Sequence, residues 1–328
     1  MKEPMIIIDG LSKRYGNLLA VNGLDLTIYK GEVFGLLGPN GAGKSTTILL
    51  LLGLTEATAG KVSVCGFDPR RQAIEVKRRI GYLPDDVGFY ENRSGMENLL
   101  FTARLNRIPK DEGVARARLL LEQVGLAGYA DKKAGTYSRG MRQRLGLADV
   151  LIKSPSIIIL DEPTLGIDPQ GVREFLDLIV RLSREQGITV LLSSHHLHQV
   201  QQVCDRVGLF VGGKLIAEGD IDALSAKLFE SEPFVVEAGI ACSDGKPLSK
   251  GEGAPQLAES LCRLEGVGSV DYSDGLFRIG CVRDNAPAIA KAVMDAGYGL
   301  TLLQKKSHGL DEIYHRYFEG GGPYGKTA

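Results

Sequence analysis

The sequence of 328 residues contains no tryptophan, and aromatic residues make up only 6% of it. Proteins that hold single-stranded nucleic acid stack bases on exposed aromatic rings, so the composition argues against such a platform. Neither sign of charge is in excess, since 39 Lys and Arg stand against 40 Asp and Glu and the formal net charge is −1. A general nucleic-acid binder carries a basic surplus, and we therefore expect no nucleic acid among the partners.

Cysteines and long apolar runs are also scarce. The five cysteines are widely spaced and form no Cys-x-x-Cys pair, which predicts free thiols in a reducing compartment rather than disulfides or a metal site. The longest apolar run, residues 48–54 (ILLLLGL), is far shorter than the ~20 residues that cross a bilayer. The N-terminus, MKEPMIIIDG, has no apolar signal-peptide core. We expect a cytoplasmic chain that acts at a membrane only through a partner.

The hydrophobic patterns that are present predict an α/β core. The segment from residue 5 to residue 28 is expected to form short strands with turns, because LDLTI at 24–28 alternates with period two. A buried strand is expected at 33–37, followed by a glycine-rich loop and a helix over 44–54. Residues 5–54 are therefore expected to form strands, a glycine-rich loop and a helix.

Two later apolar runs, 156–163 and 187–195, end in polar residues and predict parallel strands that are covered on both faces. A helix over 169–186 would connect them. Residues 87–153 show helical spacing and no strand pattern, which predicts a helical subdomain inserted between two halves of the α/β core.

The pattern changes near residue 221. The expected order is β-α-β-β-α-β, the ferredoxin-like arrangement, with strands at 234–238, 268–272, 276–282 and 300–304 and helices at 256–264 and 286–296. A last amphipathic helix is expected at 310–318. The sequence thus predicts a nucleotide-binding domain over 1–222, an accessory α+β domain over 223–320 and a disordered tail over 321–328.

The glycine-rich stretch GPNGAGKST fits the phosphate-loop pattern G-x-x-x-x-G-K-[ST], known as Walker A. Its glycines let backbone N–H groups turn inward around phosphates, and the helix that starts there adds its positive dipole end. Lys44 would bridge the β- and γ-phosphates, and the Ser45 hydroxyl would bind Mg²⁺. The predicted nucleotide-binding residues of this loop are Gly38, Pro39, Asn40, Gly41, Ala42, Gly43, Lys44, Ser45 and Thr46.

Acidic residues follow a buried strand in IIILDEP, the Walker B pattern. Asp161 would hold the Mg²⁺ shell, and Glu162 would orient and polarise the attacking water. His195 ends the next strand and would bond to the γ-phosphate and sense its loss. A zinc site in SSHHLH is disfavoured, because no carboxylate or cysteine is spaced to complete it. Tyr15, in KRYGN, is expected in an early turn and offers an aromatic face for a purine.

These motifs, together with YSRGMRQRLGLA at 137–148 and LLSSHH at 191–196, stand in the order and register of the ATP-binding cassette (ABC) family, which the first two-thirds of the chain resembles. YSRGM resembles the signature sequence of exporter ATPases for drugs, lipids and polysaccharides, whose C-terminal extension the end of the chain also resembles. The resemblance implies a head-to-tail dimer in which each ATP lies between one Walker A loop and the other copy's signature.

Roles follow from the resemblance position by position. Tyr15 would stack on adenine, Glu162 would be the catalytic base and His195 the switch histidine. Ser138 and Gly140 would face the partner's γ-phosphate. Asp168, in LGIDP, would belong to a loop that crosses the dimer interface.

Two positions depart from the family pattern. Arg139 stands where the usual signature has a second glycine, which permits a phosphate contact but removes backbone freedom. Asp85 stands where the family usually has a glutamine that meets Mg²⁺ and relays to the membrane partner. Asp85 is kept as a metal and nucleotide ligand, with Asp86 as an alternative in register.

The resemblance implies an ATPase that uses ATP and Mg²⁺ as the subunit of an ABC exporter. It would form a homodimer and power a separate integral membrane permease on the inner face of the cell membrane, with a coupling contact near residues 87–96. The alternative is a soluble ABC ATPase that acts on nucleic acid or the ribosome. A single cassette, no long heptad run and no basic face argue against it. A third hypothesis assigns ligand sensing or self-pairing to the C-terminal domain.

Overall fold

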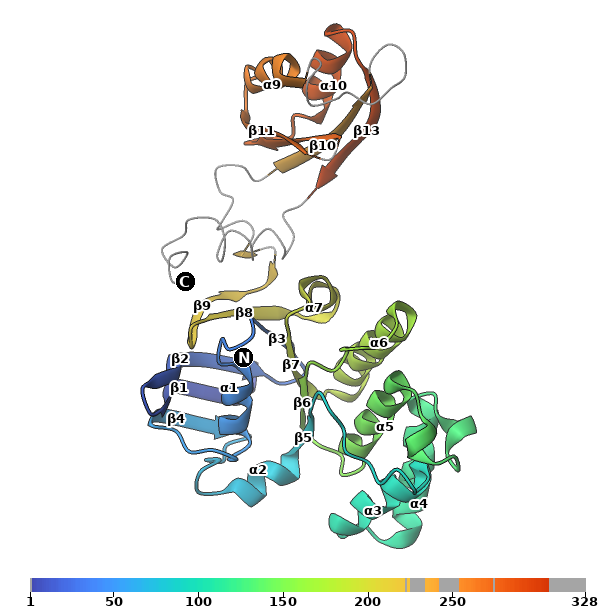
Figure 1. Ribbon diagram of the computed structural model, residues 1–328. Coiled ribbons are helices and arrows are strands. Elements are labelled where there is room, and N and C mark those ends of the chain that lie inside the picture. The colour runs from blue at the N-terminus through green and yellow to red at the C-terminus, as the bar shows by residue number, and fades with distance from the viewer. Residues whose placement is uncertain (1, 222, 225–233, 242–253, 274, 307–328) are drawn as a thin grey trace. The chain divides into compact units, whose positions relative to one another are not determined.

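The computed structural model describes residues 2–221, 223–224, 234–241, 254–273 and 275–306. The chain divides into two compact units, Met1–Asp220 and Ile221–Ala328 (Figure 1). Each unit has its own sheet and its own apolar core. The two units are therefore described separately.

A six-stranded sheet forms the centre of the first unit. Its strands run in the order β5-β6-β7-β3-β8-β9, and all neighbouring pairs are parallel except β8 and β9. The strands are β3 Val33–Leu37, β5 Ile80–Leu83, β6 Ile157–Asp161, β7 Thr189–Ser194, β8 Arg206–Val211 and β9 Lys214–Gly219. The predicted parallel pairing of β6 with β7 is confirmed. Both strands are buried almost throughout, and their central residues are apolar, because both faces of the sheet are covered.

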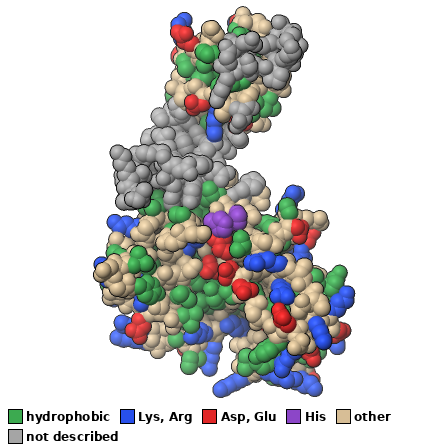
Figure 2. All heavy atoms as spheres, in the orientation of Figure 1, with side chains coloured by type: hydrophobic (Ala, Val, Ile, Leu, Met, Phe, Trp, Pro, Cys, Tyr) green, Lys and Arg blue, Asp and Glu red, His purple; other side chains and the backbone are tan. Residues whose placement is uncertain are grey.

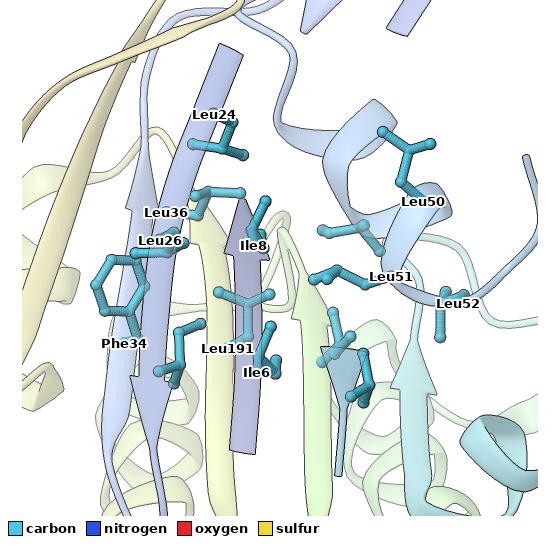
Figure 3. Close-up of a cluster of buried hydrophobic side chains, with 14 of the residues drawn as sticks. Ile6, Ile8, Leu24, Leu26, Phe34, Leu36, Leu50, Leu51, Leu52 and Leu191 are labelled. Atoms are coloured by element: carbon cyan, nitrogen blue, oxygen red, sulfur yellow. The ribbon is translucent and has the colours of Figure 1, made fainter. Parts of the chain in front are cut away.

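A second, antiparallel sheet runs in the order β2-β1-β4, with β1 Pro4–Tyr15, β2 Leu18–Tyr29 and β4 Ala59–Val64. The prediction of short strands here is wrong, because register shifts rather than chain breaks interrupt the alternation along β1. Helix α1, Lys44–Leu51, packs its leucines against this sheet and against β3 and β7 (Figure 3). It ends before the predicted residue 54, since Gly53 adopts a left-handed φ of 63°.

The remaining helices of this unit are α2 Ala73–Arg79, α3 Gly95–Leu105, α4 Lys110–Gln123, α5 Arg139–Leu151, α6 Pro169–Gln186 and α7 Leu197–Val203. Figure 1 shows α5, α6 and α7 on the side of the six-stranded sheet opposite β1 and β2. The predicted helix 169–186 is confirmed, and the predicted helical block 87–153 holds α3, α4 and α5 without a strand. Ser94 begins α3 with a capping box closed by Glu97.

The second unit follows the predicted order of strands and helices. Its elements are β10 Phe234–Ala241, α9 Ala254–Cys262, β11 Val267–Ser273, β12 Leu276–Cys281, α10 Ala286–Asp295 and β13 Gly299–Lys306. The antiparallel sheet has the order β11-β12-β10-β13. Leu261 of α9 and Ile289 of α10 pack with Phe277 of β12 in its core. The predicted helix 310–318 and the predicted disordered tail lie outside the described residues.

Four of the five predicted free thiols lie in the described part of the chain. Cys65, Cys204, Cys262 and Cys281 are free thiols, whereas Cys242 lies outside the described residues. Burial raises the pKa of the Cys65 thiol, which keeps that group protonated at neutral pH. Among the described residues, no helix has the length and hydrophobicity needed to cross a membrane.

Candidate nucleotide site

The glycine-rich loop joins the end of β3 to the start of α1, as the sequence predicts. Gly41 and Gly43 have φ values of 80° and 106°, a region that other residues rarely adopt. A Cβ on Gly43 would lie 2.4 Å from the carbonyl oxygen of Ala20, so this loop must also pass close to β2. The loop therefore needs glycine both for its turn and for its contact with the antiparallel sheet.

A pocket of about 780 Å³ opens beside this loop. It is lined by Tyr15, Leu18, Leu19, Ala20, Asn40, Gly41, Ala42, Gly43, Lys44, Ser45, Thr46, Asp85, Asp161, Glu162, Gly212 and Gly213. Residues far apart in the sequence thus meet in one cavity at the carboxyl ends of β3 and β6. In open α/β sheets, ligands bind at this edge.

Lys44 is 6% exposed, and its Nζ donates to the carbonyl oxygens of Gly38 (2.7 Å) and Pro39 (3.2 Å). Burial lowers its pKa, and the nearby carboxylates of Glu162 and Asp161 act in the opposite direction. The ammonium therefore lies at the floor of the phosphate loop, where an anionic phosphate would exchange for the two carbonyl contacts and compensate the buried charge.

Asp161 ends β6 beside Ser45 of α1. Burial is the main cause that raises the pKa of Asp161, the Ser193 and Ser45 hydroxyls oppose the shift, and the Glu162 and Asp85 carboxylates add to it. An aspartate and a serine hydroxyl are hard oxygen ligands, which Mg²⁺ prefers together with phosphate oxygens. Ser45 and Asp161 fit a magnesium ion, because a cation would offset the repulsion that the Glu162 and Asp85 carboxylates exert on Asp161.

Glu162 has a φ of 47°, which is rare for a residue with a side chain, and its N–H donates to Ser193 O at 3.0 Å. Its Oε2 is buried, lies 2.9 Å from His195 Nδ1 and makes no hydrogen bond of good geometry. Figure 2 shows the histidines in purple beside a group of acidic side chains in red. A buried carboxylate oxygen that still has a free acceptor position suits a group that must accept a proton from water.

Tyr15 is the last residue of β1, so the expectation of a turn at this position is wrong; the turn follows at Gly16. Tyr15 is 45% exposed and lies at the pocket, with Lys13 Nζ 4.7 Å from the centroid of its ring. An exposed ring at the pocket rim is available for stacking on a base.

Asp85 lines the pocket, as predicted, whereas the alternative Asp86 does not. The Asp85 carboxylate accepts from the N–H of Asp86 at 2.8 Å, and the Asp85 carbonyl accepts from Gln143 Nε2 at 3.0 Å. The carbonyl of Asp85 and one oxygen of its carboxylate are therefore engaged within the protein. Among the residues with described side chains, no three His, Cys, Asp or Glu side chains gather as a metal site.

The signature residues lie outside this pocket. Ser138 caps the N-terminus of α5 by accepting from Met141 N at 3.3 Å, and Arg139 and Gly140 form the first turn. Asp168 caps α6 by accepting from Gly171 N at 2.9 Å. The predicted site residues thus fall into two groups: one around the pocket, and one at two helix starts next to it.

The hairpin between β8 and β9 is part of the pocket and was not predicted. Gly213 N donates to Ala42 O at 3.0 Å, and a Cβ on Gly213 would lie 2.8 Å from Ala20 O. A Gly-Gly dipeptide signals a turn in sequence. The sequence does not indicate which loop that turn will touch, because the contact joins three segments separated by long stretches of chain.

A phosphate loop, a buried lysine and two consecutive acids at the end of β6 define this unit as a P-loop nucleotide-binding domain. The ABC transporter family model matches residues 21–165. The daunorubicin resistance ATP-binding protein DrrA3 of Streptomyces coeruleorubidus is 42% identical over 319 residues, covering 96% of both chains. The bacitracin transport ATP-binding protein BcrA of Enterococcus faecalis is 32% identical over 320 residues, covering 98% of both. The chain belongs to the ABC transporter family, as an ATP-binding subunit that hydrolyses ATP.

Solved structures agree with this assignment. The cbiO1 subunit of the cbiONQ ABC transporter complex from Clostridium perfringens gives a TM-score of 0.63 at 29% identity, covering 67% of this chain and 89% of that one. An ABC transporter cassette in its ADP conformation gives 0.61 at 27% identity, covering 66% and 91%. The covered share shows that the likeness concerns the cassette and not the whole chain.

Proposed function

We propose that this chain binds Mg²⁺-ATP in the pocket between β2, the phosphate loop and β6. Lys44 and the loop N–H groups would hold the phosphates, Ser45 and Asp161 the magnesium ion, and Tyr15 the adenine. Glu162 would accept a proton from the attacking water, and His195, next to its carboxylate, would contact the γ-phosphate. The observation that carries this proposal is the joint lining of one pocket by Lys44, Ser45, Asp161 and Glu162.

The proposal includes a head-to-tail homodimer. Ser138 and Gly140 start a helix whose N-terminus has no nucleotide pocket of its own, although such an N-terminus favours an anion. The ATP of a second copy would supply that anion, and Asp168 would lie at the same interface. Closure of the dimer on ATP and its reopening after hydrolysis would then supply the motion.

A separate integral membrane permease would receive that motion, holding this chain on the inner face of the cell membrane. Export is supported by three relatives, which are named for daunorubicin resistance, bacitracin transport and linearmycin resistance. The last of these is the linearmycin resistance ATP-binding protein LnrL of Bacillus subtilis. It is 38% identical over 224 residues, which are 68% of this chain and 72% of that one. The coupling contact would lie near residues 87–96. Here Ser94 caps α3, and the exposed Tyr90 packs edge-on against Phe101.

The permease proposal has a direct test. A tagged Glu162→Gln chain, expressed in its native host and extracted in mild detergent with ATP, should retain one integral membrane protein in stoichiometric amount. Recovery with ribosomes or nucleic acid, and without a membrane protein, would instead support the soluble ABC ATPase.

Ser45→Ala tests the magnesium assignment. Removing one of the proposed oxygen ligands should raise the Mg²⁺ concentration for half-maximal ATPase activity by at least about tenfold. ATP affinity in the presence of a chelator should remain unchanged, because Lys44 and the loop still hold the phosphates. An unchanged Mg²⁺ requirement would remove Ser45 from the metal shell.

The second unit would be a ferredoxin-like accessory domain over residues 223–320, after a nucleotide-binding domain over 1–222. The antiparallel order β11-β12-β10-β13, with α9 and α10 packed in one core, supports this arrangement. We propose that this unit buttresses the dimer rather than senses a ligand.

A further inference from the structure

The first two turns of α5 carry two side chains that reach the same carbonyl group. Arg139 Nη2 and Gln143 Nε2 lie 3.4 Å and 3.0 Å from Asp85 O. The two residues are four apart on one helix and therefore share a face. Gln143 is only 2% exposed, so this contact is part of the packed interior. The helix that begins with the signature is thus bonded to the loop that presents Asp85 to the nucleotide pocket.

Arg139 also binds a second loop, which runs from Glu162 to Asp168. Its Nε donates to Leu165 O at 2.5 Å. Gly166 follows with a φ of 73°, and a Cβ at Gly166 would lie 2.8 Å from Arg139 Cδ and 3.0 Å from its Nε. The absence of a side chain at Gly166 therefore leaves space for the arginine, and the loop passes directly over it.

Each of the two loops carries a different residue of the proposed site. One carries Asp85 into the pocket, and the other begins at Glu162, whose carboxylate lies beside His195. Inside the second loop, Leu165 N donates to Glu162 O and Ile167 N donates to Thr164 O. A group that holds Leu165 O therefore restrains the turn that positions Glu162.

We propose that Arg139 is a positioning residue that ties the signature helix to both loops of its own protomer's nucleotide pocket, and that it is not a ligand of the partner's phosphate. The proposal rests on the function proposed above for Asp85 and Glu162. Two different nitrogens of one guanidinium reach two carbonyl groups, which a lysine ammonium at the end of a flexible stem does not reproduce. The arginine at this position thus links movement of the helical block to the geometry of Glu162.

Hydrogen exchange on the nucleotide-free chain tests the link without requiring a dimer. In Arg139→Met and Arg139→Lys, the amides of Leu165 and Ile167 should exchange about tenfold faster, the change expected when a hydrogen bond from a charged group is lost. Arg142→Met is the matched control, because Arg142 lies on the same helix but contacts Gly135 O and Glu91. Unchanged exchange at Leu165 and Ile167 in both Arg139 variants would overturn the proposal.

Steady-state kinetics separate positioning from phosphate binding. Both Arg139→Met and Arg139→Lys should lower kcat about tenfold and leave the KM for ATP within about twofold of the wild type. A phosphate ligand would behave differently: Arg139→Lys would keep near-normal activity, and Arg139→Met would raise the KM. That pattern would contradict the proposal.

Gly166→Ala gives an independent variant, because its Cβ should displace the guanidinium. Its effect on kcat should be smaller in the Arg139→Met background than in the wild type, and full additivity would count against the contact. Failure of the proposed function is a separate result. The proposed function would fail if the Glu162→Gln chain, with Arg139 intact, formed no dimer in the presence of ATP. The exchange rates at Leu165 and Ile167 would still show whether Arg139 ties α5 to that loop.

Discussion

Glu162→Gln should reduce ATP turnover by about 100- to 10,000-fold, the range that a positioned general base contributes. Glutamine keeps the size of the side chain but does not accept a proton at neutral pH. The buried Oε2 of Glu162, which makes no well-formed hydrogen bond in the protein, is the group that is lost. ATP binding should persist, because Lys44 and the phosphate loop are unchanged, and the nucleotide-bound dimer should accumulate. Single-turnover hydrolysis and gel filtration with ATP measure both effects.

Glu185→Gln is the matched control for this substitution. Glu185 is an exposed residue near the end of α6 that does not line the pocket, and its variant should hydrolyse ATP at the wild-type rate. A Glu162→Gln chain that retains more than about a tenth of wild-type turnover would falsify the assignment of Glu162 as the base.

Asp149→Asn should stabilise the first unit at neutral pH. Asp149 lies on α5, and its buried Oδ1 has no hydrogen-bond partner. Burial raises its pKa from 3.8 to about 6, while Thr102 and Lys153 oppose the shift. Lys153 does not neutralise it fully, since its Nζ donates to Lys77 O at 2.6 Å. A shift of this size costs roughly 2 to 3 kcal/mol once the group is ionised.

The pH dependence follows from the sign of that shift. Below pH 3.8 the carboxyl is protonated in both folded and unfolded chains and carries no penalty. As pH rises from 3.8 to about 6 the unfolded chain loses its proton first, so stability falls, and above 6 the full penalty remains. The gain from Asp149→Asn should thus be largest above pH 6 and vanish near pH 4 in denaturant unfolding.

Asp177→Asn provides the control, because Asp177 is exposed on α6 and the same chemical change should leave stability nearly unchanged. Parallel pH profiles for Asp149→Asn and the wild type would show that another group causes the loss of stability. Unfolding should be followed by a probe in the first unit, since the two units need not unfold together.

The nucleotide pocket is the part of the site that local sequence predicts best. The loop at 38–46 is one continuous segment, and the roles of its glycines, lysine and serine can be predicted from neighbouring residues alone. The structure places most of this loop around the pocket. The position of Asp161 and Glu162 at the pocket can also be predicted from the sequence, because polar residues that end an apolar strand lie at the carboxyl edge of a parallel sheet. The Gly212–Gly213 turn was missed because its contact with Ala42 depends on how β8 and β9 pair.

The same distinction applies to the fold. The helix expected near 169–186 and the strand expected at 33–37 are confirmed, since an N-cap aspartate, a C-terminal glycine and an uninterrupted apolar run each act locally. The lengths of β1 and β2 were not predicted from the sequence. Both strands continue through register shifts, because β1 pairs with β2 and with β4. The alternation within one strand does not indicate how far its pairing with a distant strand will extend.

The sequence by itself determined the chemistry of this protein: a phosphate loop, two acids after a strand, and a second helix start without its own nucleotide motif. Only the tertiary structure decided what Arg139 contacts. In sequence it stands beside Ser138 and suggests a phosphate ligand, whereas in the folded chain its guanidinium reaches Leu165 O and Asp85 O. Those carbonyls lie 26 and 54 residues away along the chain, and only the packing of α5 against the sheet brings them within hydrogen-bond distance.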